Sequence, residues 1–150
     1  MELLPSWAPG LHPLIIHFPI VLLIFAVAMV LLDAIINKEW ITKASWVLLL
    51  LGSLSALAAY LTGRQAADSI GLNLMAESAI GSHSDWAFYT LSFFFIFTGV
   101  LFFVTKKAKR NKRQLKIIFA FISLIGLYLI AHTAELGGRL VYEFGLGVSK

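Results

Sequence analysis

The chain contains no cysteine among its 150 residues. This absence excludes thiolate metal sites, iron–sulfur clusters, covalently attached c-type haem and disulfide bonds. Any bound metal or cofactor must therefore be held by imidazole, carboxylate, amide or phenol groups.

Charge is also scarce in this chain. Charged residues make up only 13% of it, hydrophobic residues make up 59%, and the mean hydropathy is +0.86. Because so few polar residues cannot cover a soluble core of this size, we expect a membrane protein in contact with a lipid bilayer. The net charge of +4 does not indicate nucleic acid as a partner, because most of the basic residues lie in one short segment between apolar runs.

Four apolar runs are long enough to cross the hydrocarbon core of a bilayer, which requires roughly 20 helical residues. They cover approximately residues 14–32, 44–61, 86–104 and 117–134. No repeat, linker or low-complexity segment divides the chain. The sequence therefore predicts one domain over residues 1–150, an all-α integral membrane four-helix bundle.

The basic residues indicate the orientation of this bundle. They concentrate between the first and second runs and between the third and fourth: Lys38, Lys43, Lys106, Lys107, Lys109, Arg110, Lys112, Arg113 and Lys116. Since cytoplasmic loops are rich in lysine and arginine, we expect both termini on the periplasmic or outer side. The chain is thus expected to be a multi-pass protein of a bacterial inner (plasma) membrane.

Two segments outside the runs are themselves partly apolar. Residues 65–80 mix alanine, isoleucine and leucine with glycine, which predicts a short surface helix over the outer mouth of the bundle. Residues 135–150 are dense in glycine, and we expect this tail to fold back onto the same face.

The histidines form the most informative pattern. His12, His17, His83 and His132 are the only four, and alternate threading of the runs brings all of them to the outer side. Ionisable groups at membrane depth are costly and usually functional, so this imidazole layer is the main candidate for a site. The structural alternative is that the rings are solvated at the interface or donate hydrogen bonds between packed helices.

His12 and His17 belong to the unusual segment HPLIIHFPI at residues 12–20. Pro13 suits the first turn of a helix, whereas Pro19 leaves the carbonyl of Ile15 without its helical donor and predicts a bend. Five residues of helix add roughly 140° beyond one full turn, so the two imidazoles are not expected to point the same way.

The fourth run ends with His132, Glu135 and Arg139 at helical spacing. Glu135 is suited to orient a ligating imidazole, and Arg139 to bind an anionic group such as a haem propionate. Arg64, after the second run, is a second candidate for that role. The alternative is that Glu135 with Arg139, and Arg64 with Asp68, form ordinary surface ion pairs.

The segment at residues 12–20, His83 ahead of the third run and the segment AHTAELGGRLVYEFGLGV at residues 131–148 together resemble a bacterial membrane family, domain of unknown function 2231. The resemblance covers essentially the whole chain and implies a four-span membrane domain. The same features are similar to small bis-histidine haem b membrane cytochromes. Because the inner half of every span lacks histidine, at most one haem layer is expected. The resemblance implies functional roles for His12, His17, His83, His132 and the segment at residues 137–139.

The leading hypothesis is a haem b-binding membrane protein that transfers electrons at the periplasmic face. Two imidazoles from different helices would ligate the iron, with His17 paired with His83 or His132 as the preferred set, and with Arg64 or Arg139 near the propionates. Quinol or a periplasmic cytochrome is the expected redox partner. The sequence leaves open whether the chain is an enzyme, as a membrane cytochrome or redox subunit.

Two alternatives remain open. In the first, three or four of the imidazoles hold a bare transition metal ion, copper, zinc or iron, assisted by Glu135 or Asp85. In the second, the chain is a non-catalytic accessory subunit of a larger membrane complex, and its histidines serve helix association or proton balance.

Overall fold

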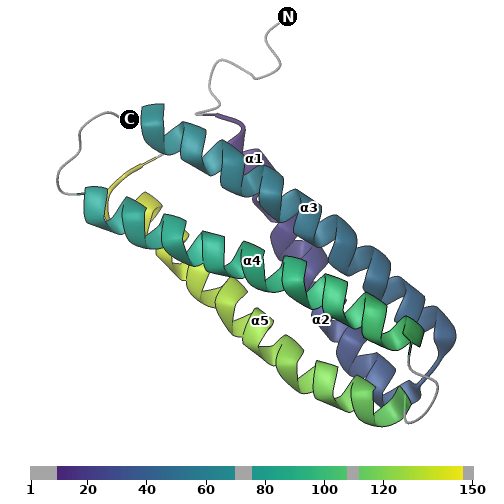
Figure 1. Cartoon of the computed structure of the whole chain (residues 1–150). Helices are drawn as coiled ribbons and strands as arrows, with labels where there is room; N and C mark the ends of the chain where they lie inside the picture. Colours follow the sequence, from purple (N-terminus) through teal and green to yellow (C-terminus); the bar gives the residue numbers. More distant parts are fainter. Residues whose placement is uncertain (1–9, 70–75, 108–111, 147–150) are drawn as a thin grey trace, which may run out of the picture.

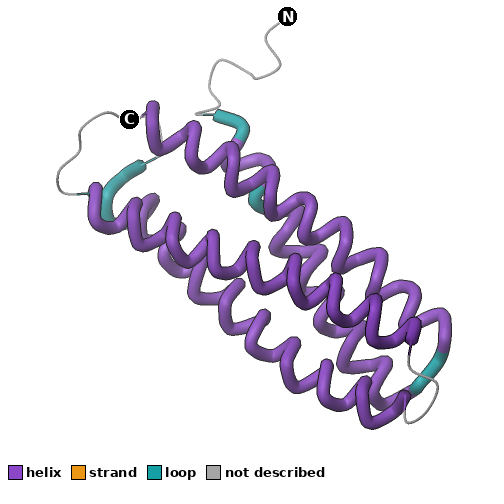
Figure 2. Tube along the Cα trace, in the orientation of Figure 1, coloured by secondary structure: helices purple, strands orange, loops and turns teal. Residues whose placement is uncertain are grey.

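The computed structural model describes residues 10–69, 76–107 and 112–146, and all regular structure within them is helical. The helices are α1 (His12–Ile15), α2 (His17–Ile36), α3 (Glu39–Ser69), α4 (Glu77–Lys107) and α5 (Lys112–Tyr142). The four long helices lie side by side with successive helices antiparallel (Figure 1, Figure 2). The predicted all-α four-helix bundle is therefore confirmed.

The last three predicted spans each lie within one long helix, and the first, at residues 14–32, begins in α1 and continues in α2. Four helical stretches are long and apolar enough to cross a membrane, namely His12–Ile36, Glu39–Asp68, Glu77–Lys107 and Arg113–Tyr142. Large apolar side chains point outward, and Ile35, Ile96 and Phe121 are 73%, 66% and 69% exposed. Such a surface is suited to lipid rather than to water, so the bundle is a membrane protein that lies in a bilayer.

The helices pack as a closed ring in which α2 contacts α3 and α5, and α4 contacts the same two helices. The short α1 packs against α2 and α3, and among the described helices it contacts neither α4 nor α5. We call the end that holds the start of α1 and α4 and the end of α3 and α5 the histidine end (Figure 1). The opposite end, with the α2–α3 turn, the end of α4 and the start of α5, is the basic end.

The hydrogen bonding of the first span is interrupted at the proline motif, as the missing N–H of Pro19 predicts. Pro13 lies in the first turn of α1, and the helix is broken at Ile16 before α2 starts at His17. Pro19 has no N–H to offer the Ile15 carbonyl, and the next backbone bond, from Ile20 N to Ile16 O, is long at 3.5 Å. The break separates the short α1, which carries His12, from the rest of the span.

Two expectations for the outer segments are wrong in the described residues. Residues 65–69 continue α3 and residues 77–80 begin α4, so they form no separate surface helix, and residues 70–75 lie outside the described part. The tail continues α5 as far as Tyr142. The chain then turns away at Gly145, which adopts a positive φ of 64°, and Leu146 N donates to Leu140 O at 3.0 Å. Residues 147–150 of the expected folded-back tail also lie outside the described part.

The buried core occupies the middle of the bundle and extends toward the basic end. Leu23, Leu49 and Phe94 are among its largest fully buried side chains. Gly52 and Gly126 allow this close packing, because a Cβ added there would lie 2.5 Å from Leu23 and 2.6 Å from Phe94, respectively. The helices are therefore fixed relative to one another mainly by the half of the bundle that lacks histidine.

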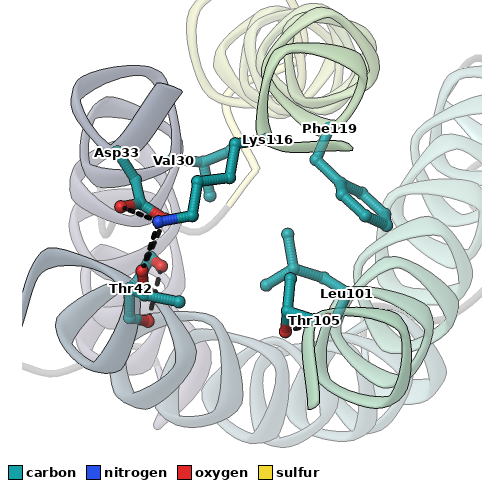
Figure 3. A pocket seen from close by; sticks show the side chains of 8 residues that line it. Val30, Asp33, Thr42, Leu101, Thr105, Lys116 and Phe119 are labelled. Carbon is teal, nitrogen blue, oxygen red and sulfur yellow. Dashed lines mark hydrogen bonds and ion pairs between the residues drawn. The ribbon is translucent and has the colours of Figure 1, made fainter. Parts of the chain in front are cut away.

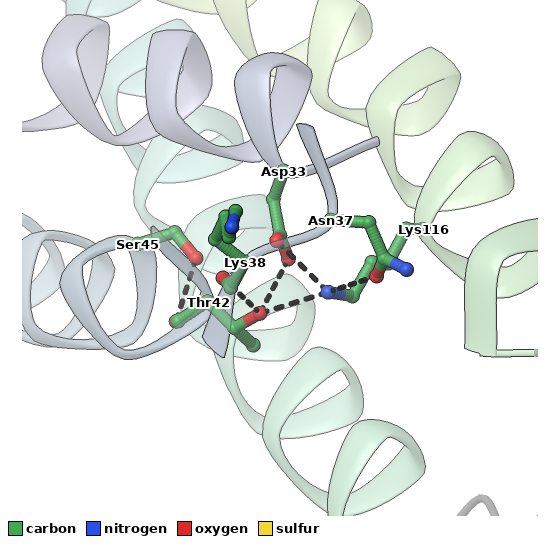
Figure 4. A network of polar contacts seen from close by, with 6 residues as sticks. All are labelled: Asp33, Asn37, Lys38, Thr42, Ser45 and Lys116. Atoms are coloured by element: carbon green, nitrogen blue, oxygen red, sulfur yellow. Dashed lines mark hydrogen bonds and ion pairs between the residues drawn. The ribbon is translucent and has the colours of Figure 1, made fainter. Parts of the chain in front are cut away.

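A buried ion pair closes the basic end (Figure 4). The Lys116 ammonium donates to Asp33 at 2.8 Å, to Asn37 at 2.9 Å and to Thr42 at 3.0 Å, and the Thr42 hydroxyl donates to the second Asp33 oxygen at 2.7 Å. Asn37 makes the tight α2–α3 turn with a left-handed φ of 53°. This network joins α2, α3 and α5 with every donor of Lys116 matched by an acceptor.

Candidate functional site

His12 is held against α3 through one ring nitrogen. Its Nδ1 donates to the backbone carbonyl of Ala59 at 3.0 Å and lies 3.4 Å from the Thr62 hydroxyl. Gly63, one turn after Ala59, lies against the ring, so that an added Cβ would sit 2.9 Å from the His12 Cε1 atom. The missing side chain at Gly63 is therefore what allows the imidazole to lie on α3.

His83 is held against α5 in the same way. Its Nδ1 donates to the backbone carbonyl of Thr133 at 3.1 Å, and a Cβ added at Gly137 would lie 3.0 Å from the His83 Cε1 atom. In both cases the accepting carbonyl and the glycine are four residues apart on one helix. The two antiparallel hairpins, α1–α2 with α3 and α4 with α5, thus present equivalent imidazoles.

These bonds fix the tautomer of each ring. Because a carbonyl oxygen only accepts hydrogen bonds, Nδ1 of His12 and of His83 carries the proton and Nε2 keeps the lone pair. A backbone carbonyl that binds the Nδ1 proton is the usual way in which proteins orient a ligating histidine. The two rings are close enough to interact electrostatically, although α1 and α4 are not in contact. Within the described part of the chain, each hairpin thus presents one imidazole with an unpaired Nε2 at the histidine end.

Hydroxyl groups support His83 on the side toward the core. Thr90 and Thr133 join α4 to α5 through a hydroxyl–hydroxyl bond of 2.8 Å, and the buried Thr90 hydroxyl also lies 3.3 Å from the Leu129 carbonyl. These bonds fix the register of the two helices immediately next to the Thr133 carbonyl that accepts from His83. The position of the His83 ring is therefore set by several contacts rather than by one.

His132 has a different set of partners. Its ring makes an edge contact with Trp86, with centroids 4.3 Å apart, and stacks on Tyr128 at 5.8 Å. Glu135 lies 3.5 Å from His132 Nδ1, which matches the predicted position of a carboxylate one turn away but exceeds normal hydrogen-bond length. His132 thus belongs to an aromatic group between α4 and α5.

The remaining predicted site residues are at the surface. His17 and Arg64 are exposed at the histidine end. Arg139 makes a bidentate pair with Glu143 at 2.9 and 3.1 Å, rather than with Glu135 as the surface-pair alternative proposed. An exposed pair of this kind is weak, and either guanidinium remains accessible to an anionic group.

The structure therefore brings together His12 and His83, whereas the preferred pair from the sequence was His17 with His83 or His132. Among residues 10–69, 76–107 and 112–146, no group of three or more histidine, aspartate or glutamate side chains is arranged to hold a metal ion. His12 and His83 share the same kind of backbone support, which His17 and His132 lack within the described residues.

The sequence did not indicate that Ala59, Thr62 and Gly63 are neighbours of His12. At Gly137, the group that approaches the helix closely is the His83 ring. The signal available for α3 was the run of small residues around Ala59, which is equally typical of plain helix packing.

Comparison with known proteins identifies the family. Residues 8–150 match the family model described as "Predicted membrane protein (DUF2231)". No curated protein and no solved structure matches the chain. The family match covers nearly the whole chain, so the chain belongs to this family of predicted membrane proteins.

Proposed function

We propose that this member of the membrane-protein family binds haem b between His12 and His83 and serves in electron transfer at the histidine end. The observation that carries the proposal is the matched pair of imidazoles, each with Nδ1 bonded to a backbone carbonyl and Nε2 left as a lone-pair donor. Haem b would supply reversible one-electron redox chemistry.

The residues around the pair fit this role. The Ala59 and Thr133 carbonyls orient the rings and increase the basicity of their Nε2 atoms. Gly63 and Gly137 leave room for each imidazole to lie against its supporting helix, since an added Cβ would be 2.9 Å from the His12 Cε1 atom and 3.0 Å from the His83 Cε1 atom, respectively. Arg64 and Arg139 are the exposed guanidinium groups of this end and are suited to bind carboxylate groups such as propionates.

The site also suggests a location and partners. Since the basic residues concentrate at the opposite end, the histidine end would face the periplasm of a bacterial inner membrane. Electrons would then be exchanged with quinol in the membrane or with a periplasmic cytochrome, either directly or as part of a larger membrane complex.

The test is the absorption spectrum of the detergent-purified protein, oxidised and then reduced. We expect a Soret band that is lost in His12→Ala and in His83→Ala and is kept in the controls His17→Ala and His132→Ala. A band that depends instead on His17 or His132 would overturn the ligand assignment. A colourless protein that keeps a metal in elemental analysis would favour the bare-metal alternative, and one with neither haem nor metal would favour the accessory-subunit alternative.

A further inference from the structure

The basic end carries a hollow that the histidine site does not use. It has a volume of about 370 Å³ and is lined by residues of the α2–α3 turn, α3, α4 and α5: Asn37, Glu39, Thr42, Lys43, Trp46, Thr105, Lys106 and Lys116. This volume falls in the ~300–1,000 Å³ range of small-ligand sites. A much smaller cavity of about 10 Å³ lies deeper, beside Asp33 and Phe119, and has room for about one water molecule (Figure 3).

The charges around the hollow favour an anion. Lys116 is matched by the buried Asp33, and Lys43 is joined to Glu39 at 2.9 Å by side chains that are 66% and 82% exposed. Such an exposed pair contributes little and is readily exchanged for another anion. Lys106 lies over the Phe102 ring at 4.4 Å, and no ion pair within the described residues joins it to a carboxylate. Two of the three lysines are thus available to a ligand.

The surroundings of the hollow favour a lipid over a soluble anion. Trp46 lines the hollow and packs edge-on against Phe102 at 5.2 Å, so the wall behind the lysines is aromatic. The neighbouring Val47 and Phe103 are 56% and 61% exposed on the lipid-facing surfaces of α3 and α4. A ligand with a negative headgroup and apolar chains would contact the lysines and this surface together.

We infer that this hollow binds the phosphate headgroup of an anionic phospholipid, with Lys43 and Lys106 contacting the phosphate and the acyl chains lying along α3 and α4. Basic recesses between membrane helices near the cytoplasmic face are suited to such headgroups. The hollow would therefore select anionic lipids from the surrounding bilayer at the end opposite the histidines.

The test is native mass spectrometry of the detergent-purified full chain with added phosphatidylglycerol or phosphatidylcholine. We expect phosphatidylglycerol to bind more tightly, and Lys43→Gln combined with Lys106→Gln to weaken its binding about tenfold or more. The matched control combines Lys38→Gln with Arg113→Gln, which removes the same charge from exposed side chains that do not line the hollow. Circular dichroism should show equal helix content for all three proteins.

Three results would overturn the inference. Equal binding of the two lipids would show that the headgroup charge is not recognised. An equal loss in the control variant would show general attraction by the basic end rather than a site. Displacement of the lipid by excess inorganic phosphate would identify a site for the free ion.

Discussion

The two ends of the bundle differ in how completely their polar side chains are paired. At the basic end, Asp33 and Lys116 satisfy one another and neighbouring side chains, and both side chains are at most 10% exposed. At the histidine end, His12 and His83 each use one ring nitrogen, and within the described residues Nε2 of each has no hydrogen-bond partner. A hydrogen-bond network whose members satisfy one another stabilises a fold. A ring nitrogen that is held in place and keeps its lone pair can instead coordinate a ligand. The difference is that the buried network of the basic end is complete within the protein, whereas each of these imidazoles keeps one ring nitrogen unpaired among the described residues.

The largest effect is expected from breaking the closed network. Asp33→Ala would leave the Lys116 ammonium buried without its carboxylate, which typically costs about 3–5 kcal/mol. Thermal unfolding of the variant in detergent, followed by circular dichroism, measures this loss. The control is Glu39→Gln, which breaks the exposed pair with Lys43 and is expected to cost less than about 1 kcal/mol. Similar losses in the two variants would contradict the contrast between the buried and the exposed pair.

The double variant Asp33→Leu with Lys116→Met tests whether the loss in Asp33→Ala comes from the uncompensated charge of Lys116. Because it removes both charges and keeps apolar volume, it is expected to recover most of the stability that Asp33→Ala loses. A double variant as unstable as Asp33→Ala would show that the hydrogen bonds to Asn37 and Thr42, rather than the uncompensated charge, carry the effect.

A smaller but more diagnostic effect is expected at the adjacent glycines of α5. In a helix, glycine to alanine stabilises by up to about 1 kcal/mol, and Gly138→Ala should show this gain because its Cβ would meet nothing within 4 Å. Gly137→Ala places a Cβ 3.0 Å from the His83 Cε1 atom, so the ring must shift and strain its bond to Thr133. We expect Gly137→Ala to show no such gain in thermal stability and to perturb the NMR signals of the His83 imidazole. Equal behaviour of the two variants would mean that the glycine does not position the ring.

The sequence predicted the features that depend on local physical chemistry. Four spans follow from the lengths of the apolar runs, and the break near Ile16 follows from the missing N–H of Pro19. The ends of the helices were predicted less well. The many glycines of residues 135–150 suggested a tail that folds back, whereas α5 continues through Gly137 and Gly138 and ends at Tyr142.

The choice of histidines could not be predicted from the sequence. The rotation between His12 and His17 showed that they point in different directions, but which of them faces the bundle depends on how α1 packs on α3. Likewise, the sequence gives the spacing of His132 and Glu135 without showing that Trp86 and Tyr128 enclose that ring. These facts belong to packing between helices, which one sequence does not specify.

The smallest effect is expected from the hydroxyl groups that support the two imidazoles. Thr90→Val removes a buried hydroxyl that lies 2.8 Å from the Thr133 hydroxyl, and loss of such a bond costs about 1 kcal/mol. The Thr62 hydroxyl near His12 bonds to the Ala58 and Ala59 carbonyls of its own helix at 2.9 and 3.1 Å, and its one link to α1 among the described residues is the 3.4 Å contact with His12. Because it makes no short bond between helices there, Thr62→Val should cost less than Thr90→Val. Thermal unfolding of both variants measures the difference. We expect the larger loss in Thr90→Val because the Thr90–Thr133 bond is the shorter of the two. A larger loss in Thr62→Val would instead show that the contact between α1 and α3 contributes more to the stability of the histidine end than the contact between α4 and α5.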